Sequence, residues 1–177
     1  MQNKEQTYRY LNSFAKYVIQ QSRSNLSKSG KSNTKALYNS LDSEIEVGAN
    51  SFRLAFLSTD YAEFVDKGVK GKTSSNRAPN SPFRFGTGSG KKGGLSEGIL
   101  KWVKQKRIQF KDKKSGKFLS YQSTSFLIVR SVYHKGIKPS LFFTKPFEKA
   151  FERLPDELIE AYGLDVEEFL KYTINKK

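Results

Sequence analysis

Hydrophobic residues recur every three or four positions near the start of the chain. We expect a helix from about residue 3 to residue 27, with its opposite side rich in Gln, Ser, Asn and Lys. The residues on its apolar side are Tyr10, Leu11, Phe14, Tyr17 and Val18. Residues 29–33 (Ser-Gly-Lys-Ser-Asn) are typical of a helix stop. The pattern therefore predicts an amphipathic N-terminal helix.

The period of the pattern changes to two between residues 41 and 56. Apolar or small residues at 41, 43, 45 and 47 alternate with Asp42, Glu44 and Glu46, and the alternation resumes at 52–56 after Gly-Ala-Asn-Ser at 48–51. Two alternating runs around such a turn indicate a β-hairpin. We expect its apolar face to pack on the protein and its charged face to meet solvent.

Helical spacing returns between residues 60 and 67. Tyr61, Phe64 and Val65 fall on one face, Asp60 is suited to the N-cap, and Gly68 is suited to a C-terminal stop. In contrast, residues 69–94 have almost no apolar periodicity and are rich in Gly, Ser, Asn and Lys. They predict a long basic loop, either an interaction loop or a segment that is partly disordered until assembly.

The rest of the chain alternates between helical spacing and breaks. Ser96 can cap a helix that contains Ile99, Trp102 and Val103, and residues 108–119 resemble a short basic hairpin or loop. A helix over 123–133 has Phe126, Leu127, Val129 or Arg130, and Tyr133 near one face, and Gly136 ends it. Pro146 suits the first turn of another helix, running to about residue 154, and residues 156–177 predict a helical extension.

Length and composition limit the class of protein. A chain of 177 residues is one domain, or one domain with a large insertion. It has no cysteine, so disulfides and thiol catalysis are excluded, and no apolar run reaches the roughly 18 residues of a membrane span. The formal net charge is +15, and residues 67–117 hold 15 basic and 2 acidic side chains. Such a segment needs phosphates, an acidic partner or open solvent.

Four patterns could mark a chemical site, and each has a plainer interpretation. Residues 88–93 match GxGxxG, but no buried strand precedes them, so we expect a flexible loop. His134, the single histidine, lies beside a predicted helix end, where a cation is favoured. Asp60, Glu63 and Asp66 could bind a divalent ion, but a solvated acidic face is the simpler interpretation.

The fourth pattern is a set of aromatic residues among basic ones, as in proteins that bind single-stranded nucleic acids. Trp102 falls at helical spacing with Ile99, which favours a place in the core, with the neighbouring lysines on a solvated face. A non-specific, salt-dependent contact with DNA remains open. The set comprises Phe83, Arg84, Phe85, Trp102, Lys104, Lys106, Arg107 and Phe110.

The order of short motifs resembles the neck or tail-completion (head–tail joining) proteins of tailed bacteriophages. Leu-Tyr-Asn-Ser-Leu at 37–41 and Tyr-Ala-Glu-Phe-Val-Asp-Lys-Gly at 61–68 are similar to two family elements, with Asp66 where Glu is usual. Ile-Leu-Lys-Trp-Val at 99–103, Gly-Ile at 136–137 and the Pro-aromatic segment at 141–147 follow in the family's order. The matching residues are Tyr61, Ala62, Val65, Gly68, Trp102, Gly136, Phe143 and Pro146.

The resemblance implies a single α+β domain over residues 1–177, with a small antiparallel sheet packed against several helices and a long basic loop insertion. It implies a structural, non-enzymatic subunit without cofactor or metal, in a homo-oligomeric ring of six or twelve copies. Portal, adaptor and tail proteins of the virion would be its partners, and the ring would surround the DNA channel. The protein would be made in the bacterial cytoplasm, with no membrane partner.

Basic residues of the middle segment are our candidates for the subunit interface or the DNA channel. They are Lys70, Lys72, Arg77, Arg84, Lys91, Lys92, Lys113 and Lys114. The alternative function is that of a basic protein that binds nucleic acid non-specifically.

Overall fold

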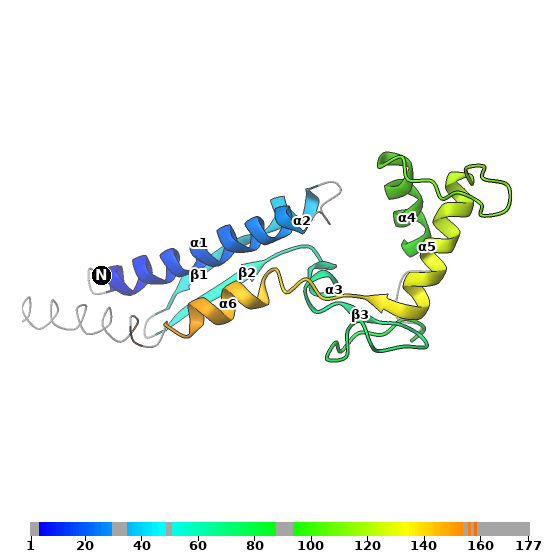
Figure 1. The fold of residues 1–177 in the computed structure, drawn as a ribbon. Helices are drawn as coiled ribbons and strands as arrows, with labels where there is room; N and C mark the ends of the chain where they lie inside the picture. Colours follow the sequence, from blue (N-terminus) through cyan, green and yellow to red (C-terminus); the bar gives the residue numbers. More distant parts are fainter. Residues whose placement is uncertain are drawn as a thin grey trace, which may run out of the picture. The chain divides into compact units, whose positions relative to one another are not determined.

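The computed structural model describes residues 4–29, 35–48, 51–87 and 94–153, with isolated positions at 156 and 158. The chain forms two compact units, Met1–Ala62 with Leu141–Lys177, and Glu63–Ser140 (Figure 1). The predicted α+β class is confirmed, since helices accompany small antiparallel sheets. One domain over 1–177 stays a prediction, and the extension predicted at 156–177 lies outside the described residues except for those two positions.

The first unit is built from both ends of the chain. Its elements are α1 (Glu5–Lys28), α2 (Ala36–Ser40), β1 (Asp42–Val47), β2 (Phe52–Leu57) and α6 (Thr144–Phe151). Helix α1 contacts both strands of the hairpin and α6 (Figure 1). Most of the face predicted from its spacing is buried: Phe14 is 5% exposed and Val18 is fully buried, but Tyr17 is 39% exposed.

The hairpin forms in the register that its alternation predicts. Ser43 lies opposite Phe56 and Ile45 opposite Leu54, so the apolar positions of both strands share one face. The main-chain N–H of Gly48 donates to the carbonyl of Ser51 at 2.8 Å across the turn. The hairpin sequence therefore specifies both its pairing and its buried side.

Phenylalanine rings from three elements form the centre of the first unit. The ring of Phe56 lies 5.2 Å from that of Phe143, 5.9 Å from that of Phe147 and 6.3 Å from that of Phe14. These pairs are edge-to-face, the arrangement that aromatic quadrupoles favour. Large rings thus join α1, the hairpin and α6, and they compensate for a low apolar fraction of 36%.

The second unit is the insertion between the two parts of the first. Its elements are α3 (Ala62–Lys67, beginning at the boundary), β3 (Val69–Lys70), α4 (Gly94–Gln105), α5 (Tyr121–Lys135) and β4 (Gly136–Ile137). Strands β3 and β4 pair antiparallel, with Val69 opposite Ile137. Helices α4 and α5 pack side by side (Figure 1).

Helix α5 (Tyr121–Lys135) extends two residues beyond each end of the predicted 123–133 and buries a different face. The hydroxyl of Ser120 caps it by accepting from the Ser123 N–H at 3.0 Å, and Gly136 ends it. Phe126, on the face that the apolar spacing singles out, is 64% exposed, whereas Thr124 is fully buried. Burial of Thr124 is tolerated because its hydroxyl accepts from the main-chain N–H of Phe110 at 3.2 Å.

Residues 69–87 are anchored within the second unit despite their lack of periodicity. Ala78 is 1% and Ser81 is 3% exposed, and Gly71 donates its N–H to the carbonyl of Ser74 at 2.8 Å. Main-chain hydrogen bonds therefore fix this stretch where apolar side chains are few. Residues 88–93, which complete the predicted loop before α4, lie outside the described residues.

Candidate functional site

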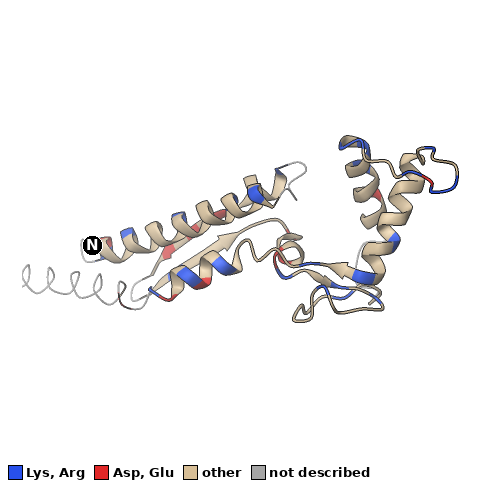
Figure 2. Ribbon diagram, viewed as in Figure 1, with Lys and Arg blue, Asp and Glu red and all other residues tan. Residues whose placement is uncertain are grey.

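Charge is divided very unevenly between the two compact units. Residues 63–140 contain 18 Lys and Arg against 4 Asp and Glu, a formal net charge of +14 out of +15 for the whole chain. Figure 2 shows the corresponding blue segments on α4, α5 and the loops of this unit. The second unit is therefore the candidate site for an anionic partner.

Strand β3 contains Lys70, the first of the basic candidates for the subunit interface or the DNA channel. Its main-chain N–H donates to the carbonyl of Phe83 at 2.8 Å, and its carbonyl accepts from the N–H of Phe85 at 2.9 Å. Together with the pairing of Lys70 to Gly136, these bonds place β3 between two neighbouring segments. Lys70 is consequently only half exposed.

Three other basic candidates for the subunit interface or the DNA channel make contacts within the second unit. The guanidinium of Arg84 donates to the carbonyl of Gly71 at 3.2 Å, and that of Arg77 donates to the carbonyl of Gly136 at 3.3 Å. The ammonium of Lys72 lies 5.8 Å from the ring centre of Tyr133. These cations stabilise the unit itself, so they are less suited to an external ligand than the sequence suggested.

The remaining basic candidates fall into two groups. Lys113 and Lys114 are exposed at the tip of a hairpin formed by residues 110–119, which we call the basic hairpin. Its two sides join through an antiparallel bridge between Lys111 and Phe118. Lys91 and Lys92 lie outside the described residues.

The motif residues in and beside α3 differ in how far they are buried. Ala62 is buried and Val65 is half-buried, whereas Tyr61 is 42% exposed. Gly68 has φ +72°, and a Cβ there would lie 2.5 Å from the carbonyl oxygen of Ile137. Only glycine fits this position, because both the conformation and the space exclude a side chain.

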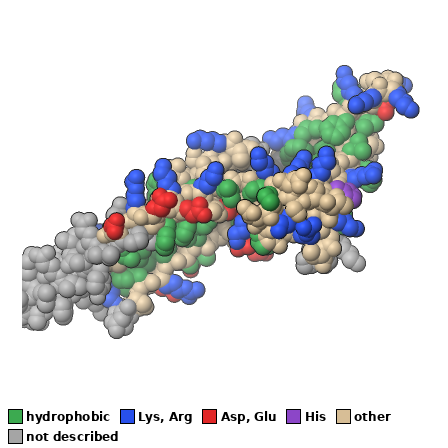
Figure 3. All heavy atoms as spheres, turned by 60° about the horizontal axis from the view of Figure 1, so that its bottom comes forward, with side chains coloured by type: hydrophobic (Ala, Val, Ile, Leu, Met, Phe, Trp, Pro, Cys, Tyr) green, Lys and Arg blue, Asp and Glu red, His purple; other side chains and the backbone are tan. Residues whose placement is uncertain are grey.

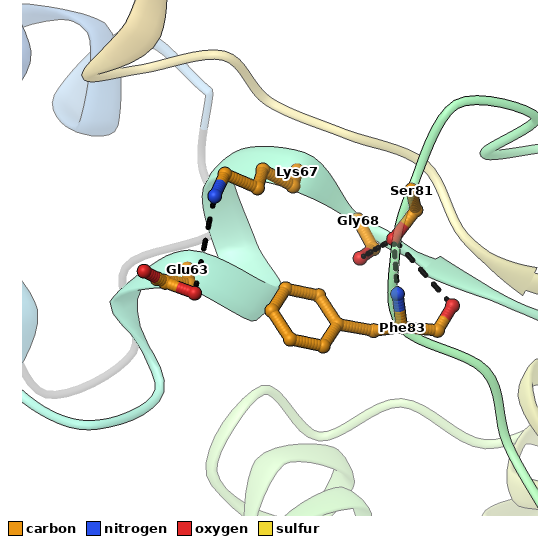
Figure 4. Close-up of polar contacts among 5 residues, drawn as sticks. All are labelled: Glu63, Lys67, Gly68, Ser81 and Phe83. Atoms are coloured by element: carbon orange, nitrogen blue, oxygen red, sulfur yellow. Dashed lines mark hydrogen bonds and ion pairs between the residues drawn. The ribbon is translucent and has the colours of Figure 1, made fainter.

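Ser81 connects the following loop to the end of α3 (Figure 4). Its hydroxyl donates to the carbonyl of Gly68 at 2.7 Å and accepts from the N–H of Phe83 at 3.1 Å. The Phe83 ring packs edge-to-face on that of Phe64, with ring centres 4.5 Å apart. The Phe83 ring, from the loop that follows β3, therefore covers part of the α3 face on which Phe64 lies.

Gly136 joins the end of α5 to β4 with φ +88°. A Cβ would lie 2.3 Å from the carbonyl oxygen of Val69 and 2.6 Å from the N of Gly71. The motif glycines, far apart in sequence, thus meet at the same β3–β4 pair: Gly68 directly precedes β3, and Gly136 is the first residue of β4.

The other motif residues lie elsewhere in the fold. Trp102 is half-buried on α4, beside Val103, which is fully buried. The core position expected for Trp102 is therefore only partly realised. In the first unit, Phe143 belongs to the aromatic centre and Pro146 is buried in the first turn of α6.

The solvated acidic face expected at Asp60, Glu63 and Asp66 is formed only in part, and Asp60 precedes α3. Asp60 and Glu63 are exposed, and Glu63 lies 3.9 Å from the ammonium of Lys67 (Figure 4). Asp66, however, is 5% exposed, and the N–H of Ser140 donates to the carbonyls of 65 and 66. In the described part of the chain, no three His, Asp or Glu side chains are grouped to hold a metal ion.

His134, expected just beside a helix end, lies within the last turn of α5. Its carbonyl accepts from the Thr73 hydroxyl at 3.2 Å, and its ring meets that of Tyr133 edge-to-face at 5.5 Å. Its main-chain carbonyl thus helps to anchor the loop that follows β3. The GxGxxG pattern at 88–93 lies outside the described residues.

Sequence reasoning missed two residues of the basic hairpin. The ammonium of Lys111 lies 5.0 Å from the ring centre of Phe118, which is 64% exposed. They are seven positions apart and meet only because the chain turns back on itself, as partners of an isolated antiparallel bridge. The available signal was the turn sequence Asp-Lys-Lys-Ser-Gly at 112–116, which sets the pairing of its flanks.

Comparison with known proteins gives no relative from which a function could be transferred to this chain. No family model, no curated protein and no solved structure matches this chain. Among the described residues, no helix is both long and apolar enough to cross a membrane.

Proposed function

We propose that this protein is a non-enzymatic structural subunit of the ring that joins the head to the tail of a tailed bacteriophage. The observation that carries the proposal is the division of charge: +14 in the second unit, against an acidic row on β1 in the first. Asp42, Glu44 and Glu46 alternate along β1 and are all exposed. A ring made by head-to-tail contacts needs two different and complementary surfaces on each copy.

The motif residues give the proposal its family. Two of the elements that resemble the head–tail joining proteins, one ending at Gly68 and the other beginning at Gly136, meet at the β3–β4 pair. Motif residues that lie together in one structural feature support a resemblance better than matching residues scattered along the sequence. The portal, adaptor and tail proteins would then be the partners, and the virion the location.

The proposal is tested in the particle and in solution. Antibody labelling of virions should place the protein at the neck, and the purified chain should form discrete oligomers in analytical ultracentrifugation at low salt. Glu44→Lys should weaken this association, because it inverts one charge of the acidic row. Glu97→Lys, the same change at an exposed position of α4, should leave it intact.

Two results would contradict the proposal. One is a protein that occurs in no particle of its phage. The other is a chain that stays monomeric at every salt and protein concentration, since a ring subunit must associate with its own copies.

A second candidate function is that of a protein that contacts nucleic acid without sequence preference. The charge of the second unit favours it, because neutralising phosphates releases counterions and drives binding. The expected signature is an affinity for DNA that falls steeply as the salt concentration rises. A wild-type chain that binds no oligonucleotide at low salt would dismiss this function.

A further inference from the structure

The basic hairpin is held in place at its base. The side-chain amide of Gln109 donates to the carbonyl of Leu119 at 2.8 Å, and the N–H of Leu119 donates to the carbonyl of Phe110, also at 2.8 Å. The N–H of Phe110 in turn reaches the buried hydroxyl of Thr124 on α5. A ligand that binds such an anchored element loses little free energy in ordering it.

The tip of the hairpin is also ordered, by Asp112. Its carboxylate accepts from the N–H of Ser115 at 2.7 Å and from the N–H of Lys114 at 3.0 Å. The hydrogen bonds from Ser115 lower the pKa of Asp112. The single acidic side chain of the basic hairpin is therefore used to shape the turn that presents its lysines.

The lysines of the tip are available to a ligand. Lys113, Lys114 and Lys117 are exposed, and within the described residues their ammonium groups make no hydrogen bond or ion pair. In this they differ from Arg77 and Arg84, whose guanidinium groups donate to main-chain carbonyls. In Figure 3 one end of the surface shows several Lys and Arg groups around a single acidic group.

An exposed aromatic ring accompanies these cations. Phe118 is 64% exposed, and Lys111 lies beside it on the same face of the ribbon, since the two residues are bridge partners. Exposure of a large ring beside ammonium groups is the arrangement on which nucleic-acid bases stack while phosphates bind the cations. The carboxylates of an acidic protein would pair with the lysines but would offer no flat ring to stack on Phe118.

We propose that the basic hairpin binds single-stranded nucleic acid, with Lys113, Lys114 and Lys117 on the phosphates and Phe118 stacked on a base. The inference names the binding element and the ligand for the second candidate function, and it is independent of the connector proposal. Duplex DNA hides the faces of its bases, so the Phe118 ring favours the single strand.

The experiment measures the fluorescence anisotropy of labelled oligothymidylate over a range of salt concentrations. Phe118→Ala should lower the affinity about 5- to 150-fold, the usual effect of removing one stacking partner. The triple variant Lys113→Gln, Lys114→Gln and Lys117→Gln should reduce the slope of log K against log salt by about 2.

Matched variants separate the hairpin from its surroundings. Phe126→Ala removes a ring that is also 64% exposed, but on the side of α5 away from Thr124, and should leave binding unchanged. Lys101→Gln, Lys104→Gln and Lys106→Gln remove the same charge from exposed positions on and just after α4, with a smaller effect on the slope. Circular dichroism checks that each variant keeps its helices.

The outcomes are distinct. If wild type binds oligothymidylate and the hairpin variants bind equally well, the inference is overturned while the second candidate function stands. If wild type binds no oligonucleotide, both fail, and the connector proposal is untouched. Tighter binding to a duplex of the same length, or equal competition by polyglutamate, would also overturn the inference.

Discussion

Replacing Gly136 by alanine tests how strictly the β3–β4 pair depends on a residue without a side chain. Gly136 has φ +88° and ψ −179°, a region almost confined to glycine, where another residue costs about 1–3 kcal/mol. The new Cβ would also lie 2.3 Å from the carbonyl oxygen of Val69, and overpacking costs about 1–3 kcal/mol. Because the obstacle is backbone, no rotamer change can relieve it.

We therefore expect Gly136→Ala to lower the free energy of unfolding of the second unit by about 2–6 kcal/mol. Hydrogen exchange followed by mass spectrometry is the suitable assay, because it reports the two units separately. Amides of 69–72 and 83–85 should exchange faster, whereas those of α1 should change little. This contrast between the units follows from the position of Gly136 within residues 63–140.

Two other glycines provide controls. Gly116 has φ +67°, but a Cβ there meets nothing within 4 Å, so Gly116→Ala should cost only the conformational part, about 1–2 kcal/mol. Gly98 lies within α4 with open space around it, and Gly98→Ala should stabilise the helix by about 0.5–1 kcal/mol. A loss below about 1 kcal/mol for Gly136→Ala would refute the reasoning.

Two further predictions concern packing and pH. Phe142 is 1% exposed, so Phe142→Ala should destabilise the first unit by about 3–5 kcal/mol in urea unfolding, whereas Phe151→Ala, at a 49% exposed position, should cost far less. The pKa of Asp112 is lowered below its usual 3.8, so its turn is favoured above that pH and loses this contribution as the pH falls through the lowered pKa. In an NMR titration, the amide of Ser115 should shift in that acidic range, and a midpoint above pH 3.8 would contradict this.

The parts of the fold that the sequence predicted are those stabilised by nearby residues. The alternation around Ile45 and Leu54 specified the hairpin, and the spacing of Phe14 and Val18 specified the buried side of α1. The glycine stop at Gly136 was equally clear. In each case the signal lies within one element or around one turn, so neighbouring positions in the sequence reveal it, even where the side chains pack on distant segments.

Elsewhere the prediction failed because distant segments satisfy polar groups. Thr124 is buried in place of the more apolar Phe126, since a hydroxyl bonded to the main chain of another segment costs little to bury. Asp66 is buried where its backbone meets the returning chain at Ser140. The hydropathy of the sequence does not reveal which distant segment will supply a hydrogen-bond partner for a buried polar group.

The sequence by itself determined the α+β class, the aromatic composition of the core and the concentration of basic residues in the middle of the chain. Only the tertiary structure decided which cations are used internally and which remain available. Arg77 and Arg84 bind main-chain carbonyls that folding brings to them, whereas the exposed ammonium groups of Lys113 and Lys114 make no hydrogen bond among the described residues. Charge is a property of the residue, but its availability depends on the atoms that folding places around it.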